Sequence, residues 1–464
     1  MRNSLLYFFF AAIMLLLFPA RVHAQNQNST LYASMNGTVQ KTLICVNQYP
    51  ASVSYVETAE GHYFVYYDGM SNTALSVSIN SIFSVNDLVI DVDTAYFCGS
   101  TVAGTGFIGY FNIQDLFFNT QEYTVSTSLF TTSHSYVASF DKMVTFTNSS
   151  SRINISRILA LIGRSQTGEY VTVEADCIPP TQTSHYHLGE LSASYNERLL
   201  DICESGNHVV TAGFVSSGST GDIALRVYLK SALFTPGGPQ DDAYVFQSGT
   251  PAVAGFDASQ VVTSALHTPL NGNMIAAAAY WKGADGLNNQ GTVVDRFRIT
   301  ATNSIGFDNG FYTIQNYLDG SEKLRGMTRQ NYLSSFYLLQ NAVELPAGSP
   351  CGEIYEMGNT PNYMTLLDIK LRSDYLLQRI DAQSSSSGYM TNGAWLGYPG
   401  RVIWNYGLGM PSSCMTQHTT QSADMVMNSA VLSHPFYINL QQTVNFQTYT
   451  GVLESIPVER VCSE

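Results

Sequence analysis

Short apolar segments, separated by turns rich in Gly, Ser and Asn, recur along most of the chain. One stretch runs through Asn86–Ile90, a polar turn, Ala95–Gly99, a Gly-rich turn and Gly106–Ile113. Apolar and polar residues that alternate over so few positions, between turn residues, predict β-strands. No helical period of useful length is visible after residue 24. The pattern therefore predicts an all-β protein.

The same pattern is repeated further along the chain. Leu200–Cys203, Val209–Phe214 and Gly221–Leu229 follow the order of the first stretch. Asp87 and Asp201 are 114 positions apart with one further copy between them, which gives a period near 57. Weaker copies are expected within residues 62–79, 157–177, 261–299, 324–357 and 366–395.

Repeats of several short strands at this period predict a β-propeller of about seven blades, with six or eight as alternatives. Tandem β-sandwiches would repeat near 100 residues. Outer-membrane barrels need strands of about 9–11 residues, longer than most segments here.

If a ring closes by pairing the chain ends, the segment near Cys45 should lie beside the C-terminal strand containing Val461 and Cys462. A Cys45–Cys462 disulfide would then be a geometric option.

Residues 1–24 have the three parts of a cleavable secretory signal. Arg2 supplies the positive charge, Leu5–Phe18 is almost entirely apolar, and small residues precede the expected cleavage before Gln25. The apolar run of 14 residues is shorter than the ~20 that a membrane-spanning helix requires. We expect a secreted, periplasmic or cell-surface protein without a membrane span. Its expected parts are a signal peptide (1–24), a flexible leader (25–40) and a single propeller domain (41–464).

Charge and composition narrow the classes of partner. The net charge is −14, and loss of Arg2 and Arg21 with the signal would make it −16. So acidic a chain is a poor match for nucleic acid, whose phosphates require Lys and Arg. Charged residues make up only 12% of the chain, and Tyr, Ser, Thr, Asn and Gly provide most of the polarity. Such a composition is typical of β-rich exported proteins.

The seven cysteines are widely spaced and contain no C-x-x-C pair. A zinc site built on thiolates is therefore not expected, and no other cofactor is indicated. Cys98 and Cys203 follow apolar strand-like runs, and we expect both to be small buried core residues.

The repeated phrases Asp87–Ile90, Phe97–Gly99 and Gly106–Phe111 resemble those of secreted propeller-like proteins of unknown function from gut Bacteroidota. The resemblance covers about residues 80–300. It implies a source and a fold, and it contains no catalytic motif that could be transferred.

The most suggestive candidate site is a cluster of aromatic residues. Trp395, Tyr398, Trp404 and Tyr406 lie within twelve residues, interleaved with Gly and Pro. Aromatic rings on such a segment can form stacking faces for sugar rings or peptides. The alternative is that these rings fill the core between two sheets.

Two motif-like strings have ordinary structural explanations. Gly104–Gly109 fits G-x-G-x-x-G, but a strand-like segment follows it where a dinucleotide site requires a helix. His185 and His187, with Glu190 nearby, could offer metal ligands, but we expect the segment to be an exposed polar loop. No metal site is predicted.

Paired carboxylates occur at Asp91 and Asp93 and at Asp241 and Asp242. Glycosidases need two facing carboxyl groups, whereas acidic residues at turns usually bind local backbone. Familiar hydrolase, metalloprotease and calcium-loop motifs are missing from the sequence.

Three hypotheses of function follow. The first is a binding module that presents a propeller surface to a glycan or a surface protein. The second is a carbohydrate-active enzyme with carboxylates in the central channel. The third is a structural or adhesive component of the cell envelope. The sequence favours binding over catalysis.

Overall fold

The structure is a computed structural model of the full chain. It describes residues 28–32, 35–44, 51–68, 73–79, 83–116, 126–148, 156–168, 170–176, 181–188, 196–217, 220–230, 241–248, 253–268, 272–283, 286–299, 305–307, 312–316, 323–329, 336–344, 349–357, 367–371, 375–382, 388–395, 398–405, 415–419, 422–423, 427–432 and 438–462. The predicted signal at 1–24 lies outside these residues.

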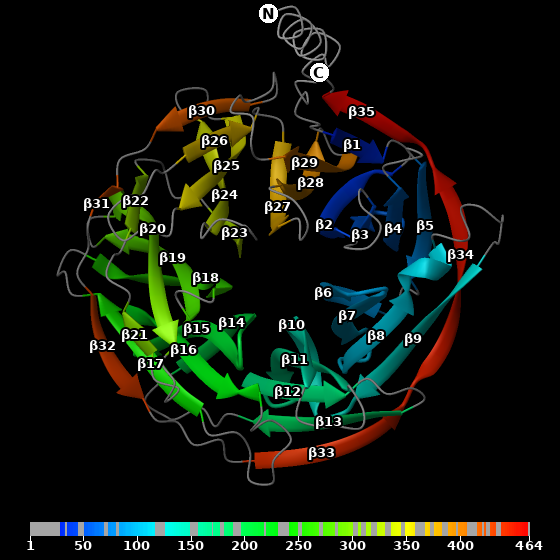
Figure 1. Ribbon diagram of the computed structural model, residues 1–464, viewed down its shortest axis with the longest axis horizontal. Coiled ribbons are helices and arrows are strands. Elements are labelled where there is room, and N and C mark those ends of the chain that lie inside the picture. The colour runs from blue at the N-terminus through cyan, green and yellow to red at the C-terminus, as the bar shows by residue number, and fades with distance from the viewer. Residues whose placement is uncertain are drawn as a thin grey trace, which may run out of the picture.

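The described strands form a ring of seven four-stranded antiparallel blades around a central axis (Figure 1). From the centre outward, blade 1 consists of β2 (Gly37–Ile44), β3 (Ser52–Thr58), β4 (His62–Asp68) and β5 (Thr73–Ile79). Blade 2 consists of β6 (Phe83–Asp91), β7 (Thr94–Thr101), β8 (Gly106–Asn112) and β9 (Ser126–His134). Blade 3 consists of β10 (Val137–Asn148), β11 (Ser156–Ser165), β12 (Tyr170–Asp176) and β13 (Thr181–Leu188).

The remaining blades continue in chain order. Blade 4 consists of β14 (Asn196–Ser205), β15 (His208–Ser217), β16 (Thr220–Leu229) and β17 (Asp241–Ser248). Blade 5 consists of β18 (Val253–Thr268), β19 (Gly272–Gly283), β20 (Gly286–Ile299) and β22 (Tyr312–Asn316), and β21 (Ile305–Phe307) also pairs with β20. Blade 6 consists of β23 (Lys323–Arg329), β24 (Phe336–Glu344), β25 (Ser349–Met357) and β26 (Leu367–Leu371). Blade 7 consists of β27 (Tyr375–Ala382), β28 (Gly388–Trp395), β29 (Tyr398–Asn405) and β1 (Asn28–Tyr32).

Neighbouring blades pack face to face and bury aromatic and aliphatic side chains between them. The Phe64 ring of blade 1 lies 4.9 Å from the rings of Phe97 and Phe111 of blade 2, measured between centroids. Cys98 is fully buried in the same cluster, and Cys203 is buried in blade 4, as the sequence predicted. The predicted β-propeller is therefore confirmed. In the described part of the chain, no helix is both long and apolar enough to cross a bilayer.

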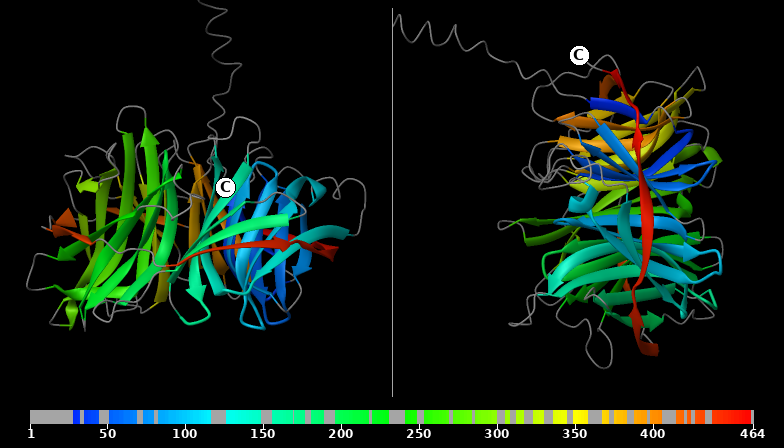
Figure 2. Two further views of the ribbon diagram at one scale, coloured as in Figure 1. Left: turned by 90° about the horizontal axis from the view of Figure 1, so that it is seen from below. Right: turned by 90° about the vertical axis from the view of Figure 1, so that its right-hand side faces the viewer.

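The last segment of the chain forms a belt around the ring, which the sequence did not predict. The belt strands are β30 (Met415–Thr419), β31 (Ser422–Ala423), β32 (Met427–Leu432), β33 (Ile438–Asn445), β34 (Gln447–Ile456) and β35 (Val458–Cys462). Running backward past blades 6, 5, 4, 3, 2 and 1 to blade 7, they pair antiparallel with the fourth strand of each blade. Figure 2 shows this segment crossing the outside of the molecule. The belt thus covers the outer edges that seven sheets would otherwise expose.

The chain ends meet in blade 7, where β1 lies between β29 and β35. Ser29 pairs with Cys462, and Tyr32 pairs with Val458. Closure by the two chain ends was predicted, but the partner of the C-terminal strand is residues 28–32. Cys45, and with it the suggested Cys45–Cys462 disulfide, lies outside the described residues.

The flexible leader predicted for residues 25–40 is wrong for most of its length. Residues 28–32 form β1, and β2 begins at Gly37, so the propeller domain includes residues before 41. Tyr32 is fully buried, and its hydroxyl lies 3.1 Å from the Ser54 Oγ.

A β-bulge interrupts the pairing of every innermost strand. The register shifts between Val39 and Lys41 in β2, Val85 and Asp87 in β6, Phe140 and Lys142 in β10, Leu199 and Asp201 in β14, Phe256 and Val261 in β18, Leu324 and Gly326 in β23, and Leu377 and Arg379 in β27. A bulge inserts an unpaired residue and bends the strand that carries it. Asn86 is the inserted residue of blade 2. Blade 3 has two inserted residues, Ala138 and Asp141, because the register of β10 also shifts between Val137 and Ser139.

Glycine stands opposite the bulge in four blades. Gly99, Gly163, Gly213 and Gly393 each pair with the residue immediately before the insertion. A Cβ added at Gly99 would lie 1.8 Å from the Ser84 carbonyl oxygen, and one at Gly163 would lie 2.2 Å from that of Ser139. The bulge presses its backbone onto the second strand, so these two positions require glycine. This explains why the predicted second strands end in small residues.

Most of the predicted repeats coincide with blades. The two clearest copies are β6–β8 and β14–β16, and blade 3 is the copy between them. The last predicted copy is out of phase, because its first segment is β26 of blade 6 and the others belong to blade 7.

A buried polar cluster joins blades 2 and 3 to the belt. His134 is fully buried at the end of β9, and its Nε2 lies 3.0 Å from Gln182 Oε1 and 2.9 Å from Thr132 Oγ1. Its Nδ1 contacts the Tyr186 hydroxyl, which also lies 3.1 Å from Gln442 Oε1 of β33. Burial lowers the pKa of His134 to about 4, and the bond to Gln182 opposes this shift only in part. His134 therefore serves as a neutral hydrogen-bonding residue.

We predict that Gly99→Ala destabilises the fold by about 3 kcal/mol, because the new methyl group overlaps a backbone carbonyl that cannot move without disturbing the bulge. Gly104→Ala is the matched control. Gly104 has a φ of 74° and open space around it, so this change should cost only about 1 kcal/mol. Urea unfolding measures both. An equal or smaller loss for Gly99→Ala would contradict the proposed close contact.

We predict a stability loss in acid that depends on His134. Because its folded pKa is near 4 and an unfolded histidine titrates near 6.5, the stabilisation is complete above pH 6.5. It falls as the pH drops from 6.5 to 4, by about 3 kcal/mol in total. The variant His134→Gln should therefore show a flatter stability profile over this window. The control Ser133→Ala, at an exposed neighbour on β9, removes no titratable group and should keep the slope of the natural protein. Equal slopes for all three proteins in urea titrations would refute the assignment.

Candidate functional site

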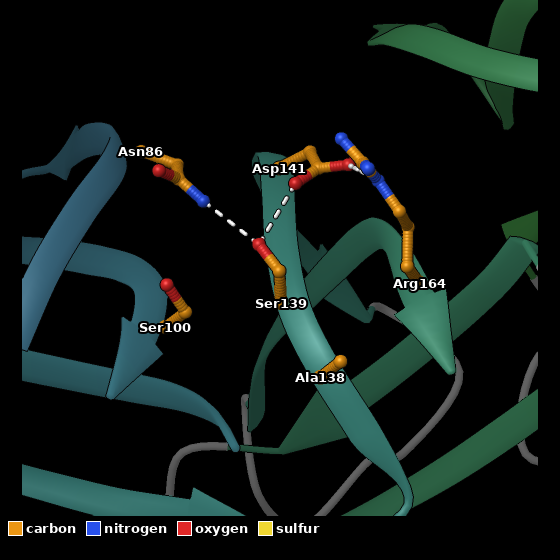
Figure 3. Close-up of a pocket in the computed structure, with 6 residues that line it drawn as sticks. All are labelled: Asn86, Ser100, Ala138, Ser139, Asp141 and Arg164. Carbon is orange, nitrogen blue, oxygen red and sulfur yellow. Dashed lines mark hydrogen bonds and ion pairs between the residues drawn. The ribbon is translucent and has the colours of Figure 1, made fainter. Parts of the chain in front are cut away.

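A polar pocket of about 450 Å³ opens between blades 2 and 3 (Figure 3). Its lining residues come from the innermost strands β6 and β10 and from the ends of β7 and β11. They are Asn86, Ser100, Ala138, Ser139, Asp141 and Arg164. The volume is within the range of sites for small molecules.

The two bulges place the central polar residues of this pocket. In a regular strand, consecutive side chains would alternate between the two faces of the blade. The insertions at Asn86 and Asp141 break this alternation and add one polar side chain to each inner strand. Gly99 and Gly163 make the bulges possible. The pocket is therefore a consequence of the repeated blade design.

A chain of hydrogen bonds connects the lining residues across the blade boundary. Asn86 Nδ2 donates to Ser139 Oγ (2.9 Å), and the Ser139 hydroxyl donates to Asp141 Oδ1 (2.9 Å). Arg164 Nε donates to Asp141 Oδ2 (3.4 Å). Figure 3 shows this sequence of contacts along one wall. Both carboxylate oxygens of Asp141 are thus occupied, and they fix the orientation of Ser139 and Arg164.

Side chains of blade 2 also bind backbone groups of blade 3 beside the bulge. Asn86 Nδ2 also donates to the Phe140 carbonyl (2.8 Å), and the Met143 amide donates to Asp87 Oδ2 (2.9 Å). The other oxygen of Asp87 pairs with Lys41 Nζ, and both side chains are almost fully buried. Removing one partner of such a buried ion pair typically costs 3–5 kcal/mol. Asp87, the residue after Asn86, therefore connects blades 1, 2 and 3.

Several polar groups of the pocket remain available to a ligand. Arg164 is half-exposed, and only its Nε is engaged among the described residues. The terminal nitrogens of its guanidinium can donate, the Asn86 carbonyl oxygen can accept, and the Ser100 hydroxyl can do both. The pocket presents donors and acceptors at fixed positions.

The aromatic cluster predicted from the sequence lies in another part of the ring. Trp395 ends β28 and pairs with Tyr398 at the start of β29, whereas Trp404 pairs with Tyr389 at the far end of the hairpin. Six residues of extended strand separate Tyr398 from Trp404, about 20 Å. Tyr406 lies outside the described residues. The stacking platform in blade 7 remains a prediction.

The other candidates are placed as follows. His185 and His187 belong to strand β13 rather than to a loop, and Glu190 lies outside the described residues. Asp93 accepts a hydrogen bond from the side-chain Nε2 of Gln114 (2.8 Å), 21 residues away, where a local backbone partner was expected. Asp241 and Asp242 begin β17. Gly104 lies in a turn and Gly106–Asn112 form β8, so the glycine string serves a turn and a strand as predicted.

None of the pocket residues was selected from the sequence. The sequence did contain one usable signal. A glycine near the end of the second strand of a blade, such as Gly99 or Gly163, indicates a bulge in the first strand of that blade. Which bulge residues border an open pocket depends on the packing of two blades, and no local pattern reports that.

Fold and pocket together define a seven-bladed β-propeller with a polar site on its innermost strands. No family model and no curated protein matches the sequence. Among solved structures, the chain is similar to the β-propeller domain of Cps50 (Swd1) from Myceliophteria thermophila, with a TM-score of 0.46 and 8% sequence identity. The superposition covers 82% of this chain and 100% of that one. It is also similar to a PL25 polysaccharide lyase, an ulvan lyase bound to -[GlcA(1-4)Rha3S]-, with a TM-score of 0.42 and 9% identity, covering 80% and 94%. No functional residue is transferred from either protein.

Proposed function

We propose that the protein is an exported binding module and that the pocket between blades 2 and 3 binds a glycan. The observation that carries this proposal is the set of unsatisfied polar groups held in a preformed pocket. Residues 1–24, which have the pattern of a secretory signal, support export to the periplasm, the cell surface or the medium.

The chemistry of the pocket suits a ligand with many hydroxyl groups. A sugar hydroxyl both donates and accepts, so different hydroxyls of one sugar can bind the Asn86 carbonyl oxygen, the Ser100 hydroxyl and the Arg164 guanidinium. Most of these side chains stand on strands and are already ordered by hydrogen bonds to one another. Binding would therefore cost little conformational entropy.

The same lining favours binding over glycoside hydrolysis. A glycosidase of the usual kind requires two carboxyl groups on opposite sides of the scissile bond. The pocket lining contains one carboxylate, Asp141, and both of its oxygens already accept hydrogen bonds. Its role is to orient its neighbours.

The test is a glycan array followed by titration calorimetry with the mature chain. We expect binding to at least one neutral glycan. Ser100→Ala should weaken it by about 3- to 10-fold, because one hydrogen bond to the ligand is lost. Ser100→Val, which also adds bulk, should abolish it. Ser133→Ala, an exposed serine of β9, is the control and should bind normally.

The double variant Trp395→Ala/Trp404→Ala tests the alternative site in blade 7. If it loses binding while Ser100→Val retains it, the ligand belongs to the aromatic hairpin and the pocket proposal fails. A drop in the melting temperature of the tryptophan variant would instead assign those rings to the core, where each truncation costs about 3–5 kcal/mol.

A further inference from the structure

Three turns lie near the pocket, and each contains a residue two positions away in sequence from a lining residue. Val102 follows Ser100 in the β7–β8 turn, and Tyr136 precedes Ala138 in the β9–β10 turn. Gln166 follows Arg164 in the β11–β12 turn. Two residues span at most about 7 Å, so all three turns lie close to the pocket.

Gln166 ties these turns together. Its Nε2 donates to the Gly104 carbonyl (2.8 Å) and to the Val137 carbonyl (3.2 Å), and its backbone amide donates to the Tyr136 carbonyl (3.3 Å). The bond to Gly104 crosses from blade 3 to blade 2. The three turns therefore form one connected rim.

The rim carries an exposed apolar surface beside a polar pocket. Val102 is 80% exposed and Tyr136 is 44% exposed. They are two of the four large exposed hydrophobic residues in the described part of the chain. Because both stand on turns that Gln166 connects, they are candidates for contact with the part of a ligand that extends out of the pocket.

The Tyr136 ring is held in place by the buried cluster that joins the belt to the ring. It packs edge-to-face on Tyr186, with 5.6 Å between the ring centroids. Tyr186 is fully buried and fixed by His134 and by Gln442 of the belt. An aromatic ring that is exposed on one side and fixed on the other is well prepared for stacking.

We propose that Val102 and Tyr136 form a lip that packs against the apolar face of a second sugar unit. The ligand would then be a neutral oligosaccharide, with one unit in the pocket and the next over the lip. Pyranose rings have an apolar C–H face and a polar edge, which matches an aromatic ring beside a set of hydrogen-bonding groups. This inference rests on the proposed glycan-binding function and names the ligand class more closely.

The test measures how affinity depends on chain length. Titration calorimetry would use mono- to tetrasaccharides of neutral β-linked glucose, galactose, mannose and xylose with the mature chain. We expect one series to gain about tenfold or more in affinity from mono- to disaccharide, the value of one stacking contact. Tyr136→Ala and Val102→Ser should reduce this gain and leave monosaccharide affinity unchanged, whereas Tyr136→Trp should retain it. Val452→Ala, an exposed belt residue, is the control.

The outcomes separate the two proposals. If the gain with length persists in Tyr136→Ala and in Val102→Ser, the lip does not contact the ligand and this inference is wrong, while pocket binding stands. If no series binds the natural chain, the glycan-binding function falls together with it. Tyr136→Ala removes the packing of Tyr136 on Tyr186 and could therefore also disturb the fold. Val102 is mostly exposed, so Val102→Ser tests the lip without this complication.

Discussion

The bulge in each innermost strand is the constraint on which the rest of the molecule depends. An inserted residue leaves backbone groups without partners in its own blade, and a buried group without a partner is costly. In blade 3, the Phe140 carbonyl and the Met143 amide, which lie beside the insertion, bind Asn86 and Asp87 of blade 2. Packing between blades is thus fixed by directional polar contacts as well as by aromatic burial. The same insertions supply the side chains of the pocket.

The belt satisfies backbone groups at the perimeter of the ring. A ring of separate sheets has an outer edge on every blade, and each edge is a site for unwanted pairing. One C-terminal segment covers all seven edges, and it also supplies Gln442 to the buried cluster around His134 and Tyr186. Because Tyr186 supports Tyr136, a residue from the far end of the chain helps to order the rim of the pocket.

The sequence predicted the parts of this structure that depend on local pattern. Strand–turn alternation and a period near 57 led to a propeller of about seven blades, and apolar neighbours correctly indicated that Cys98 and Cys203 are buried. It did not predict the belt, because residues 415–462 are strand-like in composition but pair only with strands distant in sequence. Residues 28–32 were misassigned for the same reason. The pocket was missed because Asn86, Asp141 and Arg164 are separated along the chain and meet only when two blades pack.

The central claim is that the bulges of blades 2 and 3 form the ligand site. Hydrogen–deuterium exchange, measured with and without the tightest-binding oligosaccharide, tests this claim most directly. The account predicts added protection in peptides covering residues 84–87, 100–105, 135–142 and 164–168. It predicts none in the blade 7 hairpin at residues 388–405. Protection confined to that hairpin, with unchanged exchange at the two bulges, would contradict it.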